Sequence, residues 1–167
     1  MANNMKGKVK LVHDQISKLT PAAFLKANIS IAIVAATFER LTNRRLKNYN
    51  LNHSSFMILY LIVENGGSMN ITDITRRLYL TRQAVSLTTR CLEKQGLVSR
   101  NGIKGDRRKI RVEITEKGLE LVRKIGTSDD RRQIHHVLAS ILNEDEALQL
   151  ATTLNLIARK LHRMKYI

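Results

Sequence analysis

The residues best suited to recognise another molecule lie between Arg82 and Lys94, in a segment with helical periodicity. At 100° per residue, Val85, Thr88 and Leu92 gather on one side of this helix, and a mostly polar set gathers on the other. Arginine and glutamine each form paired hydrogen bonds to base edges, and leucine can contact a thymine methyl group. The alternative is a face that is only solvated. The residues predicted to contact bases or phosphates are Arg82, Gln83, Ser86, Leu87, Arg90 and Lys94.

A second basic group follows at the expected tip of a hairpin. Asp106 stands two residues before Arg108 and can hold its guanidinium group by a charge-assisted hydrogen bond. An arginine oriented in this way suits a narrow minor groove, and Arg107 lies beside it. The alternative is an ordinary turn aspartate next to unconstrained arginines.

The charge of the chain indicates a polyanionic partner. The 29 Lys and Arg outnumber the 14 Asp and Glu, for a formal net charge of +15. Between Ile71 and Arg111 there are 11 basic residues and three acidic ones, so this segment has a net charge of +8. Such a cluster favours phosphate contacts and predicts binding that weakens as salt rises.

A membrane is the less favoured anionic partner. The longest mostly apolar stretch, residues 29–38, is too short to span a bilayer. The N-terminus has lysines but no apolar core that is typical of a secretory signal. We therefore expect a cytoplasmic protein that does not enter a membrane.

Two short helices must position the basic face. Asn70 and Asp73 have capping-box spacing and open the first helix, and Thr81 opens the second after a turn over residues 78–80. This spacing predicts a helix-turn-helix. An earlier helix begins at Asn52. Because helix N-termini attract anions, the predicted phosphate contacts are Ser54, Ser55 and Thr81.

A β-hairpin directly follows the second helix. Apolar residues alternate with charged ones over residues 110–114, and residues 97–102 are the expected partner strand. Thr115 is the expected N-cap of the helix that follows. The predicted fold class is therefore mainly α with one β-hairpin, a winged helix-turn-helix flanked by N- and C-terminal helices. We expect a DNA-binding region at 49–115 and a helical dimerisation region formed by 1–48 and 116–167.

The C-terminal helix has an apolar stripe that indicates a helical partner. Asn143 is its expected N-cap, and the apolar residues then step by 4, 3, 4 and 3. The stripe predicts dimerisation, although it could instead pack within its own subunit. The predicted dimerisation residues are Leu150, Leu154, Ile157, Leu161 and Met164.

The remaining residue types do not indicate catalysis or a cofactor. Cys91 is the single cysteine, which excludes an intramolecular disulfide, and we expect it to be a small packed thiol. Adjacent His135 and His136 point about 100° apart on a helix, which disfavours a shared metal. We therefore expect neither a metal nor a cofactor, and no enzymatic activity.

Three segments together resemble the multiple antibiotic resistance regulator (MarR) family of bacterial transcription factors. They are residues 92–100, 106–108 and 114–118. The resemblance implies a homodimer whose two winged motifs read a pseudo-palindromic operator, with Arg108 in the minor groove. It also implies a repressor that a small phenolic or aromatic acid releases from DNA. Thr75 and the bulky Tyr79 depart from the family pattern.

Taken together, the sequence predicts a dimeric, sequence-specific regulator that binds double-stranded DNA. From the family resemblance, we expect it to act as a repressor. One alternative is an architectural DNA-binding protein with no effector and little sequence preference. Another is a protein-interaction module whose basic face binds an acidic partner. Comparing specific with random duplexes at several salt concentrations distinguishes these three functions.

Overall fold

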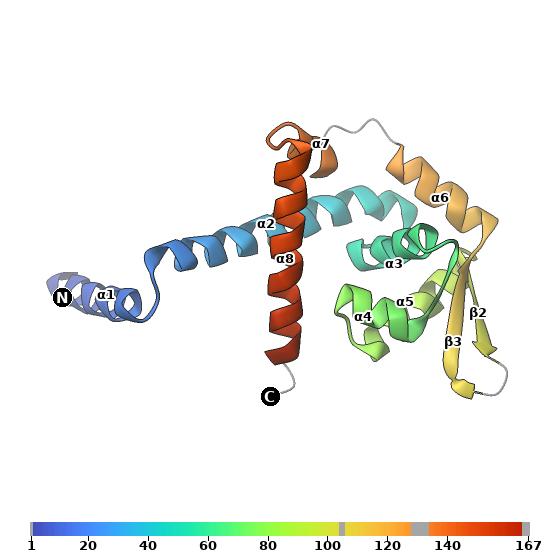
Figure 1. Ribbon diagram of the computed structural model, residues 1–167, viewed down its shortest axis with the longest axis horizontal. Helices are drawn as coiled ribbons and strands as arrows, with labels where there is room; N and C mark the ends of the chain where they lie inside the picture. Colours follow the sequence, from blue (N-terminus) through green and yellow to red (C-terminus); the bar gives the residue numbers. More distant parts are fainter. Residues whose placement is uncertain (1, 104–105, 128–133, 165–167) are drawn as a thin grey trace. The chain divides into compact units, whose positions relative to one another are not determined.

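The computed structural model describes the backbone of residues 2–103, 106–127 and 134–164 (Figure 1). Within these ranges, the side chains of residues 2–4, 7, 17, 19, 103, 106–109 and 134 are not described. The chain divides into two compact units, Met1–Arg44 and Arg45–Ile167. The predicted division into 1–48 with 116–167 and 49–115 therefore stays a prediction.

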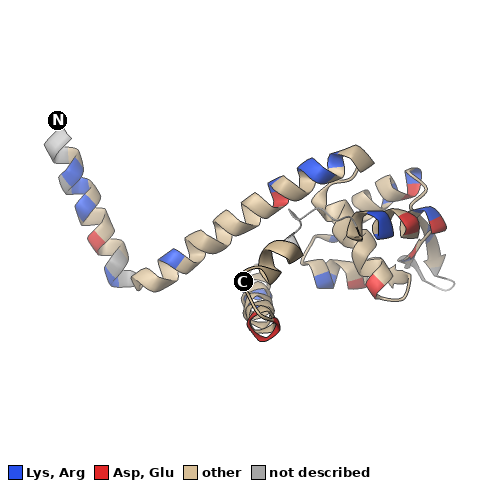
Figure 2. Cartoon of the chain, turned by 90° about the horizontal axis from the view of Figure 1, so that it is seen from above, with Lys and Arg blue, Asp and Glu red and all other residues tan. Residues whose placement is uncertain are grey.

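The first unit consists of helix α1 (Ala2–Leu19) and most of helix α2 (Ala22–Leu46). Pro21 directly precedes α2, and its carbonyl oxygen accepts a hydrogen bond from the Phe24 amide at 2.9 Å. Charged side chains are sparse over the first part of α2 and cluster towards its C-terminal end (Figure 2). Most of the apolar side chains of α2 are exposed, including Ile29 at 58% and Ile33 at 59%.

The apolar length of α2 corrects one expectation. The segment Ala22–Tyr49 is long and apolar enough to cross a membrane, by length and composition alone. The expectation from sequence considered only residues 29–38 and therefore underestimated the length of the apolar helix. None of the apolar segment of α2 is buried in the single chain. Its apolar surface therefore needs a partner that covers it.

The second unit contains the winged region. Its helices and strands are a 3-10 turn η1 (Lys47–Tyr49), α3 (His53–Glu64), β1 (Ser68–Asn70), α4 (Ile71–Leu78), α5 (Arg82–Lys94), β2 (Val98–Ile103), β3 (Asp106–Ile114) and α6 (Glu116–Gly126). The predicted helices at Asn52, Asn70, Thr81 and Thr115 and the predicted hairpin are confirmed. The sequence missed β1, which adds a third strand.

The three strands form an antiparallel sheet in the order β1-β3-β2. Strand β3 is central: Val112 pairs with Met69 of β1 on one side and with Arg100 of β2 on the other. The register shifts between Gly102 and Ile103, where the hairpin becomes irregular. The wing thus has its base fixed by three strands.

A core beneath the sheet joins these elements. It includes Leu46, the last residue of α2, which belongs to the second unit. Gly118 permits the close approach of α6 to the chain before β2, since a Cβ atom there would collide with the Leu97 carbonyl oxygen. The largest fully buried side chains are those of Leu46, Ile58, Leu59, Ile62, Ile71, Ile74, Leu92 and Ile125.

The chain ends in α7 (Ile134–Ala139) and α8 (Glu144–Met164). Asn143 caps α8 as predicted, in a reciprocal arrangement. Its Oδ1 accepts from the Glu146 amide at 3.0 Å, and its own amide donates to Glu146 Oε2 at 2.9 Å. The apolar stripe of α8 is between 38% and 62% exposed in the single chain.

Candidate DNA interface

Helix α5 is held by a cap at its start and by apolar packing along one side. The Thr81 hydroxyl oxygen accepts from the Ala84 amide at 3.2 Å. Val85, Thr89 and Leu92 are fully buried. The sequence placed Thr88 on the packed side, but Thr89 is the buried threonine, and its hydroxyl donates to the Ser86 carbonyl oxygen at 3.1 Å. A local hydrogen bond thus lets a polar residue occupy the core position.

The opposite side of α5 faces outward, as predicted. Arg82, Gln83, Arg90 and Lys94 are exposed. Leu87 is 64% exposed in the middle of this polar face, although leucine is usually buried. An exposed apolar residue among hydrogen-bonding side chains fits a surface that meets base edges and a thymine methyl group.

Two of the predicted residues also make contacts within the protein. The Arg82 guanidinium group contacts the Thr72 hydroxyl of α4 at 3.5 Å, at the limit of a hydrogen bond. Ser86 is half-buried and accepts from Arg100 Nη2 at 3.4 Å. Ser86 therefore has a partner behind the exposed face, which constrains its side chain before any ligand binds.

Arg100 is a residue that the sequence analysis missed. Its side chain is 9% exposed, and its guanidinium group lies 3.7 Å from the Glu93 carboxylate as well as beside Ser86. Among the described side chains, Arg100 Nε is buried without a hydrogen-bond partner. Arg100 thus ties strand β2 to two points on α5. Arginine is seldom buried unless it is paired, so the local sequence gives no reason to expect Arg100 in this position.

The wing arginines lie near the start of strand β3. Asp106, Arg107 and Arg108 belong to β3 by backbone, but their side chains lie outside the described residues. At the base of the wing, Arg111 donates to the Ser68 hydroxyl at 2.5 Å and lies 3.2 Å from Glu113. A hydrogen bond therefore joins the base of the hairpin to β1. The predicted hydrogen bond between Asp106 and Arg108 stays a prediction.

The three predicted phosphate contacts differ in accessibility. Thr81 is exposed and Ser54 is half-buried. Ser55 is buried at 9% exposure, and its amide donates to Asn52 Oδ1 at 2.8 Å. The prediction that Ser55 contacts phosphate is therefore corrected. Its amide already donates to the N-cap side chain, and packing buries its own side chain.

Cys91 also differs from its prediction. The thiol was expected to be packed, but it is free and exposed. The residue lies on α5 between the outward-facing Arg90 and the buried Leu92. A one-residue step along a helix turns a side chain by 100°, enough to move this position from the packed side to the surface.

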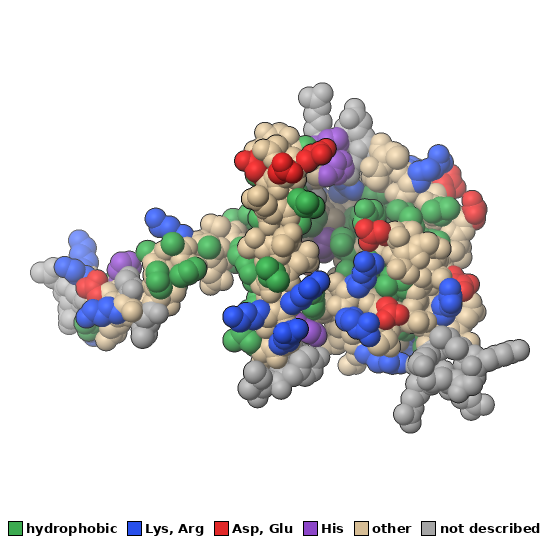
Figure 3. All heavy atoms as spheres, viewed as in Figure 1, with side chains coloured by type: hydrophobic (Ala, Val, Ile, Leu, Met, Phe, Trp, Pro, Cys, Tyr) green, Lys and Arg blue, Asp and Glu red, His purple; other side chains and the backbone are tan. Residues whose placement is uncertain are grey.

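Charge is unevenly distributed over the second unit. Acidic side chains crowd the N-terminal end of α8, whereas Lys and Arg side chains gather over its C-terminal end and the adjacent winged region (Figure 3). Glu144, Asp145 and Glu146 form the acidic group, which suits a helix N-terminus. The basic end of this surface offers complementary charge to a phosphate backbone.

Comparison with known sequences identifies residues 51–110 as a match to the MarR family. The transcriptional regulator SarZ of Staphylococcus haemolyticus is 33% identical over 76 residues, which is 46% of this chain and 51% of SarZ. The chain spans about half the length of the curated relatives that it matches. The relatives are described as helix-turn-helix transcriptional regulators.

Solved structures share the fold over most of the chain. The regulator BldR of Sulfolobus solfataricus is 26% identical, with a TM-score of 0.66 over 87% of this chain and 97% of BldR. An E. coli MarR variant complexed with operator DNA is 20% identical, with a TM-score of 0.65 over 84% of this chain and 96% of that chain. NadR in complex with 4-hydroxyphenylacetate is 24% identical, with a TM-score of 0.67 over 79% and 92%.

Proposed function

We propose that this chain, whose residues 51–110 match the MarR family, is a sequence-specific transcriptional regulator that binds double-stranded DNA. One observation carries the proposal: α5 has a capped start, a packed inner side and an outer face of exposed base-reading side chains. The relatives are transcriptional regulators rather than enzymes.

In the proposed complex, α5 enters the major groove and the wing reaches the adjacent minor groove. Gln83, Ser86 and Arg90 read bases, and Leu87 contacts a thymine methyl group. Ser54 and Thr81 bind phosphates, while Arg107 and Arg108 anchor the wing. The structure of a MarR variant with operator DNA, which shares this fold, supports a DNA-bound state for the same architecture.

The proposal is tested by gel shift with a duplex selected by the protein and with a random duplex. Arg90→Ala should weaken binding of the selected duplex by about 1–3 kcal/mol, because a bidentate base contact is lost. It should also reduce the difference in affinity between the selected and the random duplex. Arg108→Ala should weaken binding through loss of the minor-groove contact.

Arg123→Ala is the matched control. It removes an exposed arginine from α6, on the same unit but outside the proposed interface. Equal losses from Arg90→Ala and Arg123→Ala would show that only net charge matters. That outcome, with equal binding of both duplexes, would favour an architectural DNA-binding protein, which the net charge of +15 makes a concrete second candidate.

We propose further that the regulator acts as a homodimer. The exposed apolar surfaces of α2 and α8 need a cover, and a second copy supplies one of matching chemistry. Lipid is the poorer cover for α2, because Lys26, Asn28 and Ser30 interrupt its apolar surface. We therefore propose that the protein acts in the cytoplasm, together with its operator.

A repressor released by a small molecule is the mode of action that we favour. NadR in complex with 4-hydroxyphenylacetate shares the fold, which supports a small phenolic or aromatic acid as the class of effector. An added effector of this class should then dissociate the complex with the selected duplex in a gel shift. Transcription from that duplex that rises with effector would fit repression, and transcription that falls would contradict it.

A further inference from the structure

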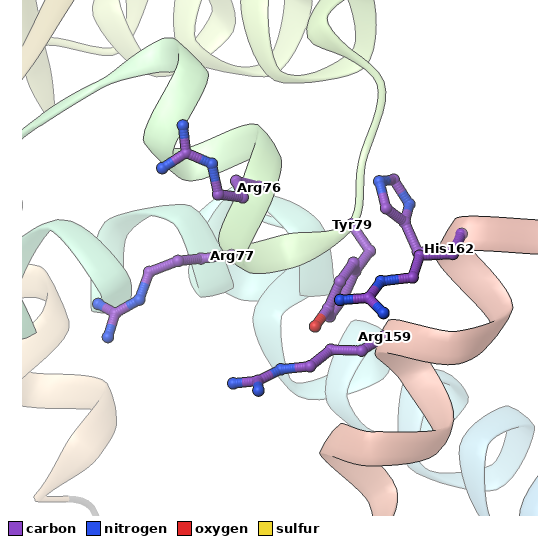
Figure 4. Close-up of a pocket in the computed structure, with 6 residues that line it drawn as sticks. Arg76, Arg77, Tyr79, Arg159 and His162 are labelled. Carbon is purple, nitrogen blue, oxygen red and sulfur yellow. The ribbon is translucent and has the colours of Figure 1, made fainter. Parts of the chain in front are cut away.

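A cationic cluster lies where the end of α4 meets the C-terminal half of α8 (Figure 4). Tyr79 extends from the end of α4 towards α8, where Arg159 and His162 lie around its ring. The Tyr79 and His162 rings are 5.2 Å apart between centroids, so an aromatic contact joins the end of α4 to α8. The residues of this α4–α8 cluster surround a hollow of about 430 Å³ and are Arg76, Arg77, Tyr79, Arg159, His162 and Arg163.

The α4–α8 cluster has a strong excess of positive charge. It contains four arginines, and no acidic residue is among the described residues that form it. On the winged side, Arg76 lies 3.3 Å from Asp73, and Arg77 lies 4.0 Å from Glu64. The two arginines of α8 form no ion pair with any described acidic side chain, so the surplus charge comes mainly from them.

Arg159 and Arg163 lie on the side of α8 that is opposite to its apolar stripe. They are four residues apart and thus share one helix face. Arg159 follows Leu150 by nine residues, and nine steps of 100° place it half a turn away from the stripe. A second copy of the chain that covers the stripe therefore leaves both arginines uncovered. Like charges at this spacing repel, and a bound anion removes the repulsion.

Tyr79 places the α4–α8 cluster beside the start of the proposed reading helix. Tyr79 ends α4, and Thr81, two residues later, caps α5. Two residues of chain span at most about 7 Å. The Tyr79 backbone is left-handed, with φ of 53°, a conformation that is unfavourable for a bulky aromatic residue. The turn that leads into α5 thus also supplies the ring that contacts α8.

The exposure of the arginines favours a phosphate backbone over a small enclosed ligand. The Arg76 side chain is 75% exposed and the Arg77 side chain is 52% exposed, and both arginines of α8 are exposed as well. A small-molecule site buries most of its ligand, whereas DNA phosphates are bound at the protein surface. Guanidinium groups match the geometry of phosphate oxygens and bind them in pairs.

We propose that the α4–α8 cluster is a second contact with the DNA backbone, separate from the outer face of α5 and from the wing. Arg159 and Arg163 bind phosphates at the edge of the groove that α5 enters, and Arg77 extends the positive surface onto α4. Helix α8 then has two functions, because its apolar stripe dimerises and its opposite face binds DNA. This inference rests on the proposed function. It adds affinity without sequence preference, since phosphates carry no sequence information.

The salt dependence of duplex binding tests this contact. Arg159→Gln with Arg163→Gln should weaken binding of the selected and the random duplex by the same factor, at least about fivefold at about 0.1 M salt. The slope of log affinity against log salt concentration should become less steep by about 0.9 for each phosphate contact that is lost. The ratio of the two affinities should stay the same, whereas Arg90→Ala should lower it.

Arg123→Gln with Lys124→Gln is the matched control. It removes the same charge from exposed positions on α6, outside the α4–α8 cluster and outside the proposed interface. Its affinities and its slope should change clearly less. Sedimentation velocity should show the same assembly state for both double variants and the unaltered protein, because neither variant alters the apolar stripe of α8.

Tyr79→Asn tests the placement of α8 without removing charge. Asparagine tolerates the left-handed backbone, so the turn is kept while the ring contact with His162 is lost. We expect weaker binding of both duplexes and a less steep slope, because the arginines of α8 are no longer held beside the start of α5. An unchanged slope would overturn the placement on which the contact depends.

Three results for Arg159→Gln with Arg163→Gln would overturn the inference while duplex binding by the unaltered protein supports the proposed function. The first is an unchanged slope. The second is a change equal to that of the control, since net charge alone would then explain it. The third is a lower ratio of selected to random affinity, which would assign the effect to base reading. An unaltered protein that binds no duplex would instead refute the proposed function, and this inference with it.

Discussion

Arg100 lies behind the exposed face of α5 and joins it to strand β2 by contacts with Glu93 and Ser86. We expect Arg100→Gln to lower the free energy of unfolding by about 1–2 kcal/mol, because the shorter side chain leaves polar partners unsatisfied. It should also weaken duplex binding, since Ser86 loses its restraint. Urea denaturation and gel shift measure the two effects.

Arg111→Gln provides the comparison for Arg100. Arg111 also lies beside a glutamate, but its side chain is 53% exposed. An ion pair in contact with solvent contributes little, so its loss should cost below about 1 kcal/mol. Equal costs for the two variants would show that the burial of Arg100 is unimportant.

Gly118 lies where the backbone of α6 closely approaches the backbone of Leu97. A Cβ atom at Gly118 would collide with the Leu97 carbonyl oxygen, whereas one at Gly126, in the same helix, would meet nothing within 4 Å. Gly118→Ala should therefore lower stability by about 1–3 kcal/mol, as overpacking does, and Gly126→Ala should not. Thermal unfolding of both variants measures the difference, and similar melting temperatures would refute the close approach.

At the scale of elements, the helix caps illustrate both success and failure of prediction. Thr81 and Thr115 accept hydrogen bonds from backbone amides as their spacing predicts. Asn70 has the right spacing too, but its side chain makes no cap bond and instead donates to Asp73 Oδ2 at 3.3 Å. The local sequence determines which residue stands at the cap position. Whether its side chain forms the cap bond depends on its rotamer, and therefore on neighbouring residues.

This difference predicts unequal costs for two similar substitutions. Thr81→Ala should destabilise the protein by about 1 kcal/mol, because α5 loses the acceptor for its first turn. Asn70→Ala should cost clearly less, since it removes no cap bond. Chemical denaturation compares them; a larger loss for Asn70→Ala would contradict the assignment of the caps.

Elements with strong periodicity were predictable, whereas the three-residue strand β1 was not. The alternation over residues 110–114 identified the hairpin, and the helical pattern identified α5. Strand β1 has three residues, too few to show a period, and it exists because Met69 pairs with Val112 far along the chain. Such pairing is invisible in a local window.

At the scale of the whole molecule, the apolar stripe of α8 predicts self-association. Leu154 is 40% exposed and Ile157 is 38% exposed in the single chain. Leu154→Asp with Ile157→Asp should shift a dimer to monomer in sedimentation velocity, because charges in an apolar interface are costly. A monomeric unaltered protein would refute the dimer.

Thr152→Asp with Asn155→Asp supplies the control for this shift. Both residues are exposed on α8 and lie on the side away from the stripe. The control adds the same charge to the same helix, so dimerisation should persist. Dissociation in both variants would mean that acidic charge on α8, rather than its apolar stripe, causes the effect.

The sequence by itself determined the winged helix-turn-helix, the outward face of α5 and the caps at Asn52, Thr81, Thr115 and Asn143, because each depends on contacts within a few residues. The tertiary structure alone decided that Ser55 is covered, that Arg100 supports Ser86, and that Tyr79 meets His162. These features depend on residues distant in the chain, whose approach is determined by packing rather than by any local pattern.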